Sequence, residues 1–184
     1  MKYKIIAFSG SVRKESYTTK LVKAFKALAP ENVTVDLIDI SNLPFINEDL
    51  EENLPESIKN LHRIIKSSDG VIFATPEYNR SYSPVLKNAI DWGSRPKGNN
   101  TWNKKPVAVV GCTLHILGAF GAQNHLRQVL MYLNMIPLQQ PEFYLGGVAD
   151  KFDEKGKLTD EHTKQKIAEV WNALMEQIEI RKIC

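Results

Sequence analysis

Cysteine is scarce in this sequence, and no spacing typical of a cysteine metal site or redox pair occurs. The 184 residues contain only Cys112 and Cys184, so a Cys-x-x-Cys motif is absent and no cysteine cluster is available to a metal. Two cysteines in a chain of this length are typical of a reducing compartment. The scarcity therefore predicts that the protein holds no metal and works in the cytoplasm.

Long hydrophobic runs are absent as well. The first apolar run, IIAF at residues 5–8, is too short for the apolar core of a signal peptide or for a membrane span. Cys184 is the last residue, which leaves no room for the C-a-a-X motif of prenylated proteins. We expect no association with a membrane.

The sequence also lacks a strong excess of one charge sign. It has 24 Lys and Arg residues against 21 Asp and Glu residues, which gives a net charge of +3 at pH 7. The basic residues are scattered and form no arginine-rich stripe, so a nucleic-acid partner is not expected. Such a distribution is typical of a solvated surface, with at most a bias toward anionic ligands.

Apolar runs alternate with amphipathic stretches along the chain. The apolar runs predict strands at residues 3–8, 33–39, 71–74, 107–110 and 136–139. Helical spacing of apolar residues predicts helices around residues 21–28, 58–65, 85–92, 126–133 and 159–178. Loops or turns are expected at residues 41–53, 93–105, 111–121, 145–148 and 153–156.

This order of elements predicts an α/β fold. Strands separated by helices imply parallel pairing with right-handed crossovers. Hydrophobic residues make up 43% of the chain, which is enough for a sizeable core. We find no linker or internal repeat, so we predict one domain over residues 1–184: a doubly wound, five-stranded parallel sheet with helices on both faces.

Three loops of this fold are candidates for binding. In a doubly wound sheet, ligands bind beyond the carboxyl ends of the strands, at the switch point of the strand order. The rule selects the loops after the first, third and fourth strands, at residues 9–19, 75–84 and 111–121.

The first of these loops reads SGSVRKESYTT and has the composition of an anion-binding cradle. It supplies hydroxyl donors and Arg13, whose forked guanidinium matches phosphate geometry. The next helix directs its N-terminal amides into the same space. The alternative is a Ser/Thr-rich helix cap with an exposed arginine, but the position after a buried strand favours phosphate binding. Because G-x-G-x-x-G and G-x-x-x-x-G-K-[ST] are absent, a classical dinucleotide fold and a P-loop NTPase lose support.

The second loop reads TPEYNRSYSP and suits a flat ring. Its prolines restrict the backbone, Tyr78 can lie along a ring, and the Asn79 side chain can bond to polar ring edges. A proline-bounded turn with Asn79 as a cap explains the same residues equally well. The loop alone does not separate the two interpretations.

The third loop reads GCTLHILGAFG, and its small residues allow a backbone to approach a ring closely. His115 suggests catalysis, although a lone loop histidine is more often simply exposed. Cys112 directly follows a buried strand and is better explained as small core filler than as a nucleophile. We therefore name no catalytic side chain.

Four motifs together resemble the NADPH-dependent FMN reductase family. They are GSVRKES at 10–16, TPEYN at 75–79, LKNAIDW at 86–92 and QNHLRQ at 123–128. The similarity runs from residue 3 to about residue 148, with order and spacing intact. The combination is highly specific, although each motif alone is not. The family has a flavodoxin-like fold and includes quinone, chromate and azo-dye reductases.

The resemblance implies a set of FMN-binding residues. The FMN phosphate would be held by Ser11, Arg13, Ser16 and Thr18. The edge of the isoalloxazine ring would be lined by Pro76, Glu77, Tyr78 and Asn79. The other side of the ring would be closed by the loop that contains Thr113, His115 and Gly118. The chain departs from the family pattern at Thr18, where asparagine is common, and at His115 and Ala119, where glycine is common.

The resemblance also implies an activity. Hydride would pass from NADPH or NADH to FMN and then to a small-molecule acceptor: a quinone, an azo dye, a metal oxyanion or a flavin. Family members are usually homodimers or homotetramers. The helix surfaces at residues 90–92 and 130–133 are candidates for the subunit contact, or they simply cover the sheet.

Two other functions stay open at this stage. A flavodoxin-type electron carrier would share the fold, but such carriers are typically acidic, and the positive net charge and Arg13 oppose this interpretation. A flavin-binding protein without turnover would be consistent with the replacements at His115 and Ala119. Reduction of bound flavin by NADPH would discriminate both from a reductase.

Overall fold

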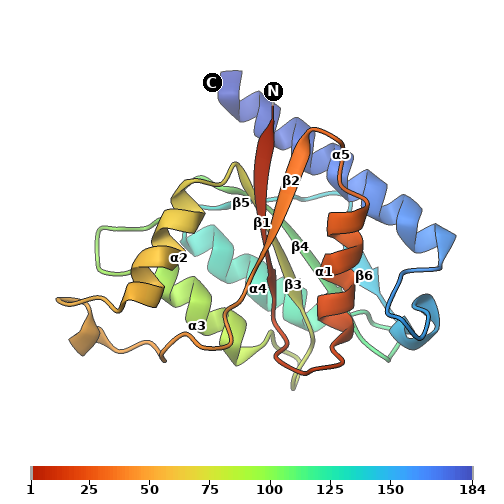
Figure 1. The fold of residues 1–184 in the computed structure, drawn as a ribbon, viewed down its shortest axis with the longest axis horizontal. Coiled ribbons are helices and arrows are strands. Elements are labelled where there is room, and N and C mark those ends of the chain that lie inside the picture. The colour runs from red at the N-terminus through yellow and green to blue at the C-terminus, as the bar shows by residue number, and fades with distance from the viewer. Residues whose placement is uncertain (1, 184) are drawn as a thin grey trace.

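A computed structural model describes residues 2–183 and shows a parallel sheet covered by helices on both faces (Figure 1). The strands are β1 (Tyr3–Ser9), β2 (Val33–Ile38), β3 (Gly70–Thr75), β4 (Pro106–Cys112), β5 (Ile136–Pro137) and β6 (Phe143–Leu145). The helices are α1 (Tyr17–Ala27), η1 (Glu48–Leu50), α2 (Glu56–Lys66), α3 (Pro84–Gly93), α4 (Phe120–Tyr132), η2 (Val148–Lys151) and α5 (Glu161–Ile183). Cys184 lies outside the described residues.

The sheet has the strand order β2-β1-β3-β4-β5, and every pairing is parallel. The order turns back at β1, because β2 lies on one side of it and β3 on the other. This is the flavodoxin-like, doubly wound topology that the sequence predicted.

The edge of the sheet beside β4 differs from the prediction. The expected strand at 136–139 is limited to β5, which pairs with the start of β4, and β6 then pairs with the end of β4. The Leu138 N–H still donates to the Val107 carbonyl at 2.9 Å, and Pro141, which has no N–H to donate, stands between the two pieces. The edge is therefore one strand in two pieces, and Leu145, expected in a loop, belongs to the second piece.

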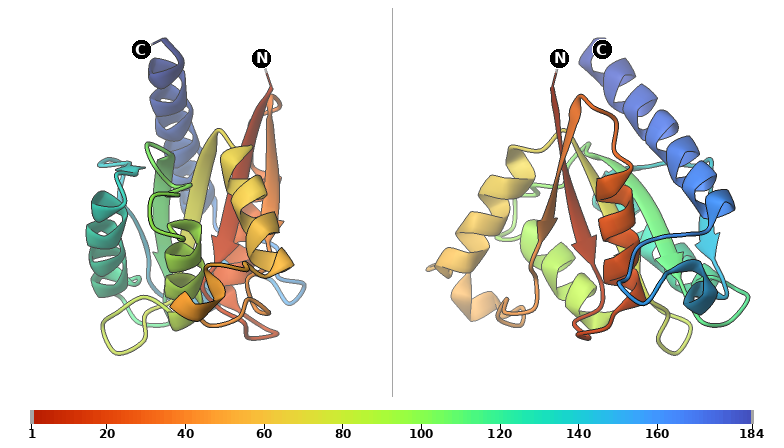
Figure 2. Two further views of the ribbon diagram at one scale, coloured as in Figure 1. Left: turned by 90° about the vertical axis from the view of Figure 1, so that its left-hand side faces the viewer. Right: turned by 45° about the vertical axis from the view of Figure 1, so that its right-hand side comes forward.

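Two apolar cores lie on the two faces of the sheet. Ile5 and Ala7 of β1 point toward α1 and α5, whereas Ile6 and Phe8 point toward α2, α3 and α4. The alternation follows from the two-residue period of a strand. Figure 2 shows the sheet between these two groups of helices from two further sides. Both cores pack on the same sheet. Because its strands are parallel, the loops that follow β1, β3 and β4 leave the sheet at the same edge.

The 93–105 segment is more than the surface loop that the sequence predicted. Trp102 is fully buried between Phe8 and Phe73, at ring-centroid distances of 5.8 and 5.4 Å. Its indole N–H donates a hydrogen bond to the Ile90 carbonyl at 2.8 Å. A side chain at Gly93 would lie 2.2 Å from the indole nitrogen, so glycine is required there. One apolar residue in a polar run has no periodicity, which explains why the pattern missed it.

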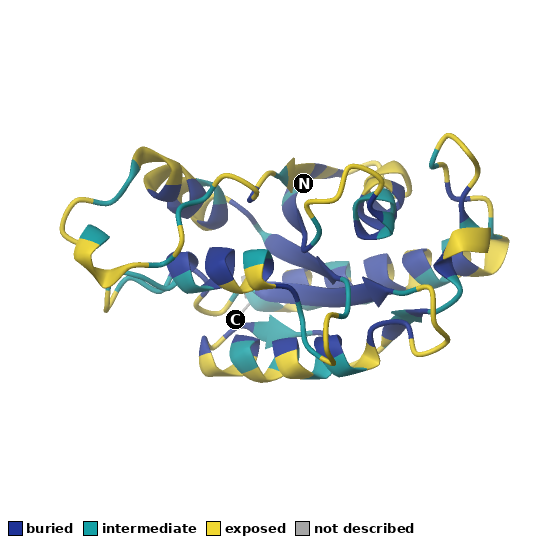
Figure 3. Ribbon diagram, turned by 90° about the horizontal axis from the view of Figure 1, so that it is seen from below, coloured by how far each residue is buried: buried dark blue, intermediate teal, exposed yellow. Residues whose placement is uncertain are grey.

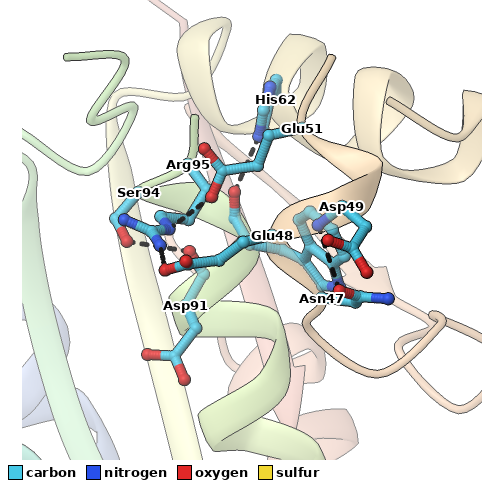
Figure 4. Close-up of polar contacts among 9 residues, drawn as sticks. Asn47, Glu48, Asp49, Glu51, His62, Asp91, Ser94 and Arg95 are labelled. Atoms are coloured by element: carbon cyan, nitrogen blue, oxygen red, sulfur yellow. Dashed lines mark hydrogen bonds and ion pairs between the residues drawn. The ribbon is translucent and has the colours of Figure 1, made fainter. Parts of the chain in front are cut away.

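The 41–54 segment is fastened to the end of α3 (Figure 4). Arg95 forms ion pairs with Glu48 and, at 2.7 Å between Nε and Oε1, with Glu51. The Trp92 indole donates to the Pro44 carbonyl at 2.7 Å. These contacts hold a long connection against the helix and away from the carboxyl ends of β3 and β4.

The two apolar surfaces suggested for a subunit contact prove to be different. Ile90 and Trp92 are fully buried, so that part of α3 covers the sheet. On α4, Leu130 is buried in the same way, whereas Met131 and Tyr132 are 69% and 89% exposed. Only α4 therefore offers apolar side chains to a partner among the residues suggested from the sequence.

Trp102 gives a test of this packing. Replacing Trp102 by Ala should lower the free energy of unfolding by about 3–5 kcal/mol, because it removes a buried aromatic side chain and leaves a cavity. Trp102→Phe should cost less, since most of the ring contacts survive. Chemical denaturation of the purified variants measures both changes. Lys59→Ala, at an exposed position of α2, is the control and should stay within about 0.5 kcal/mol; an equally small effect of Trp102→Ala would contradict the buried position.

Candidate functional site

The three candidate loops meet at the carboxyl edge of the sheet. Figure 3 views the molecule from this edge and shows exposed loops around the ends of buried strands. A cavity of about 200 Å³ opens between the loops. It is lined by Ser11, Arg13, Ser16, Tyr17, Thr18, Pro76, Glu77, Tyr78, Cys112, Thr113, Leu114, His115 and Val148. Nine of the eleven predicted site residues lie on this wall; Asn79 and Gly118 do not.

Hydroxyls and Arg13 gather at the α1 end of the cavity. Ser16 is the N-cap of α1, and its hydroxyl accepts a hydrogen bond from the Thr19 N–H at 3.1 Å. The Thr18 side chain is buried on the first turn, and Arg13 is exposed. Within residues 2–183, Arg13 forms no ion pair. Its guanidinium is therefore available to an anion at the positive end of the helix dipole.

Gly10 lets the first loop approach the second. Its N–H donates to the Ala74 carbonyl at 2.8 Å. A Cβ at this position would lie 2.7 Å from the Ser83 hydroxyl and 3.0 Å from the Pro76 ring. Any larger residue would push the anion-binding loop away from the ring-binding loop, so glycine sets the distance between the two ends of the cavity.

The second loop forms a tight turn. Tyr78 and Ser81 exchange two backbone hydrogen bonds of 2.9 Å, and the residues between them, Asn79 and Arg80, have φ values of 49° and 66°. Positive φ at both central positions is the pattern of a type I′ turn. Tyr78, which is 45% exposed, lies on the cavity wall. Asn79 lines an adjoining hollow of about 400 Å³ together with Glu77, Thr113 and His115.

Glu77 joins the second loop to the third. The N-cap position of α4 is Ala119, which has φ 66° and no side chain that can cap the helix. The Glu77 carboxylate supplies the missing acceptor, because Oε2 accepts a hydrogen bond from the Ala122 N–H at 3.0 Å. Glu77 therefore has a role at the helix terminus in addition to its place on the cavity wall.

The third loop rests on β6 and on the segment that follows it. The Thr113 N–H donates to the Leu145 carbonyl at 3.0 Å, and the Val148 N–H donates to the Thr113 carbonyl at 3.2 Å. Gly118 has φ 56°, and a Cβ there would lie 2.5 Å from the Leu145 nitrogen. Gly118 thus holds the loop against β6, while Thr113 and His115 face the cavity.

Cys112 is buried at the floor of the cavity, as the core-filler interpretation predicted. Its side chain is 3% exposed, and the Thr18 hydroxyl lies 3.9 Å from its sulfur. Burial raises the pKa of the Cys112 thiol to about 12. The thiol stays protonated at neutral pH and is a poor nucleophile.

The structure adds residues that the sequence pattern missed. Tyr17 lies inside the first loop motif, so it was within reach of the prediction. Val148 reaches the wall from η2, in a segment expected to be a turn, and no local signal marks it. The described residues contain no group of three or more His, Cys, Asp or Glu side chains placed to hold a metal. No described helix is long and apolar enough to cross a bilayer.

The cavity suits a ligand with one phosphate and one flat ring. Hydroxyls, a guanidinium and a helix N-terminus stand on the side of α1, whereas a proline and a tyrosine come from the second loop and Thr113, Leu114 and His115 from the third. The residues thus fit FMN, the cofactor that the sequence motifs implied, and no nucleophile–base pair is needed beside it.

Comparison with known proteins agrees with this geometry. Residues 3–150 match the family described as NADPH-dependent FMN reductase. A quinone reductase from Pseudomonas putida is 47% identical over 159 residues, which is 86% of each chain. A 2-hydroxy-1,4-benzoquinone reductase from a Burkholderia species is 38% identical over 165 residues, 90% of each chain.

A solved structure shares both fold and sequence. FerB, a flavoenzyme NAD(P)H:(acceptor) oxidoreductase from Paracoccus denitrificans, superimposes with a TM-score of 0.90 at 38% identity. The alignment covers 96% of this chain and 97% of FerB. Together with the family match and the quinone reductase relatives, it shows that this chain belongs to the NADPH-dependent FMN reductase family.

Proposed function

We propose that this protein is an FMN-dependent NAD(P)H oxidoreductase that reduces quinones. The observation that carries the proposal is the single cavity in which an anion-binding end and a ring-binding end meet, in a chain whose relatives are quinone reductases. Azo compounds, metal oxyanions and free flavins are further acceptor classes that an open ring site would admit.

Bound FMN would supply the redox chemistry, accepting hydride from the nicotinamide and passing it to the acceptor. The side chains and loops of the protein would hold the cofactor and orient its ring. Ser11, Arg13, Ser16 and Thr18 would bind the phosphate. Pro76, Glu77, Tyr78, Asn79, Thr113, His115 and Gly118 would place the ring or the loops against it.

The protein contributes position and electrostatics rather than a reacting side chain. Cys112 is protonated and buried, and His115 stands exposed at the rim. An open cavity of this kind lets the nicotinamide leave before the acceptor enters the same place. This arrangement favours a ping-pong reaction.

A homo-oligomer is part of the proposal. Phe120, Met131 and Tyr132 on α4 are 51%, 69% and 89% exposed, and a second copy of the chain would cover them. We also propose that the chain is one domain, since both cores use one sheet, and that it acts in the cytoplasm, as its cysteine content predicts.

The function is tested by a visible spectrum of the protein after FMN is added and excess is removed, followed by anaerobic titration with NADPH and then a benzoquinone. Bleaching by NADPH and recovery with the quinone support the proposal. A retained spectrum that NADPH does not bleach would favour an electron carrier. If no flavin is retained, NADPH oxidation that depends on added FMN separates weak cofactor binding from an inactive fold.

Arg13 tests the phosphate end of the site. Arg13→Ala should raise the Kd for FMN about 10- to 100-fold, because a charged hydrogen bond contributes about 1.5–3 kcal/mol. Affinity for riboflavin, which lacks the phosphate, should stay the same. Equilibrium dialysis with both flavins makes the comparison, and Lys14→Ala is the matched control for loss of one exposed cation. Equal affinity of Arg13→Ala and the parent protein for FMN would remove the phosphate assignment.

Cys112 tests the absence of thiol chemistry. Since burial raises its pKa, the thiol should remain protonated between about pH 6 and pH 9 and resist iodoacetamide in the native protein. Peptide mass spectrometry distinguishes Cys112 from Cys184. The Cys112→Ala variant should oxidise NADPH within about twofold of the parent rate. Rapid native alkylation, or loss of turnover in a variant that still binds FMN, would contradict this.

A further inference from the structure

One buried amide, that of Gln123, lies beneath the loop on the ring side of the cavity. Gln123 is on the first turns of α4 and is fully buried. Its Nε2 donates to the Phe143 carbonyl at 2.9 Å and to the Gly118 carbonyl at 3.2 Å. One side chain therefore connects helix α4, the end of the third loop and strand β6.

The surroundings make room for this amide. Gly111 of β4 has no side chain, and a Cβ there would lie 2.8 Å from Gln123 Nε2. The glycine is paired with Thr75 of β3, so the amide stands behind the ends of the two central strands, where the ring-binding loops begin. A side chain on β4 at this position would exclude the glutamine.

Half of this amide lowers the stability of the fold. Gln123 Oε1 is buried and has no hydrogen-bond partner within residues 2–183. A buried acceptor without a partner costs about 1–3 kcal/mol, and an apolar side chain of similar shape would avoid that cost. The useful half of the amide is the N–H₂ group, which bridges a carbonyl of β6 and a carbonyl at the end of the third loop.

We propose that Gln123 is a positioning residue for the flavin ring: its amide fixes the loop of Thr113 to Gly118 against β6, and the loop in turn fixes His115 and Thr113 beside the ring. The inference rests on the proposed function. It concerns the ring side of the site, since the Gln123 amide donates to the third loop and to β6 and, within residues 2–183, forms no side-chain hydrogen bond with residues 9–19.

Gln123→Met tests the assignment, because methionine has nearly the same length and no hydrogen-bonding amide. FMN and riboflavin should both bind at least about 10-fold more weakly, which is a loss of about 1.4 kcal/mol. The flavin spectrum and the midpoint potential should shift in protein saturated with FMN, since the ring environment changes. Competition of inorganic phosphate with FMN should give an unchanged phosphate affinity.

Two control variants separate positioning from general stability. Gln128→Ala removes an exposed amide from the same helix, and this variant should bind FMN normally. Leu130→Ala removes a buried side chain from the far end of α4. If Leu130→Ala weakens FMN binding as much as Gln123→Met at equal loss of stability, Gln123 has no positioning role.

Gln123→Glu adds a pH profile. The protonated acid can still donate to one carbonyl, whereas the carboxylate would face two carbonyl oxygens and be repelled. FMN binding by this variant should therefore weaken as the pH rises through the pKa of the new acid. FMN binding by Gln123→Met should show the same pH dependence as FMN binding by the parent protein. Parallel pH profiles of the parent and Gln123→Glu would overturn the proposal.

Hydrogen exchange keeps the inference testable even if the function is wrong. In flavin-free protein, Gln123→Met should speed amide exchange in residues 113–120 and leave residues 9–19 unchanged. If the parent protein binds no flavin, the proposed function fails, and exchange still decides whether Gln123 orders the loop. Unchanged exchange in residues 113–120 would refute the role of Gln123 by itself.

Discussion

The contacts between loops at the carboxyl edge are the constraint on which the site depends. Strand order alone brings the three loops to one edge, but it does not set their spacing. Gly10 sets the distance between the first two loops, because a Cβ there would lie 2.7 Å from the Ser83 hydroxyl and 3.0 Å from the Pro76 ring. Glu77 sets the distance between the second and third, because its carboxylate caps α4. The cavity is thus a product of close approach and capping.

The sequence carried most of this arrangement in local patterns. The buried strands are continuous apolar runs, so β1, β3 and β4 were predicted in place, and the carboxyl-end rule then selected the right loops. Ser11, Arg13 and Tyr78, which line the cavity, were predicted as site residues because short polar segments follow β1 and β3 directly, whereas Thr113 was implied by the family resemblance. Family resemblance added the identity of the ligand, which hydroxyls and prolines alone do not specify.

What the sequence missed depends on contacts between distant residues. Trp102 stands alone in a polar run, and only the ring contacts with Phe8 and Phe73 reveal it as core. β6 is three residues long, too short for a period to appear. The capping role of Glu77 could not be predicted, because it depends on the left-handed conformation of Ala119, which is 42 residues further along the chain. Such features are decided by tertiary packing, which overrides local preference.

The residues proposed to hold the cofactor and those at the rim of the cavity differ in how firmly they are fixed in the fold. The groups proposed to hold the phosphate lie on a helix N-terminus and on a loop whose backbone is anchored to β3, so they would bind an anion without reorganising. Tyr78 and His115, which line the cavity and would face the acceptor under this proposal, are exposed. Acceptor choice could therefore change by substitution at the rim with little cost to the fold, whereas Gly10, which is buried, and Glu77, which is half-buried, are each tied to contacts with a neighbouring loop or helix. A family that shares one cofactor and many acceptors is the expected consequence of this arrangement.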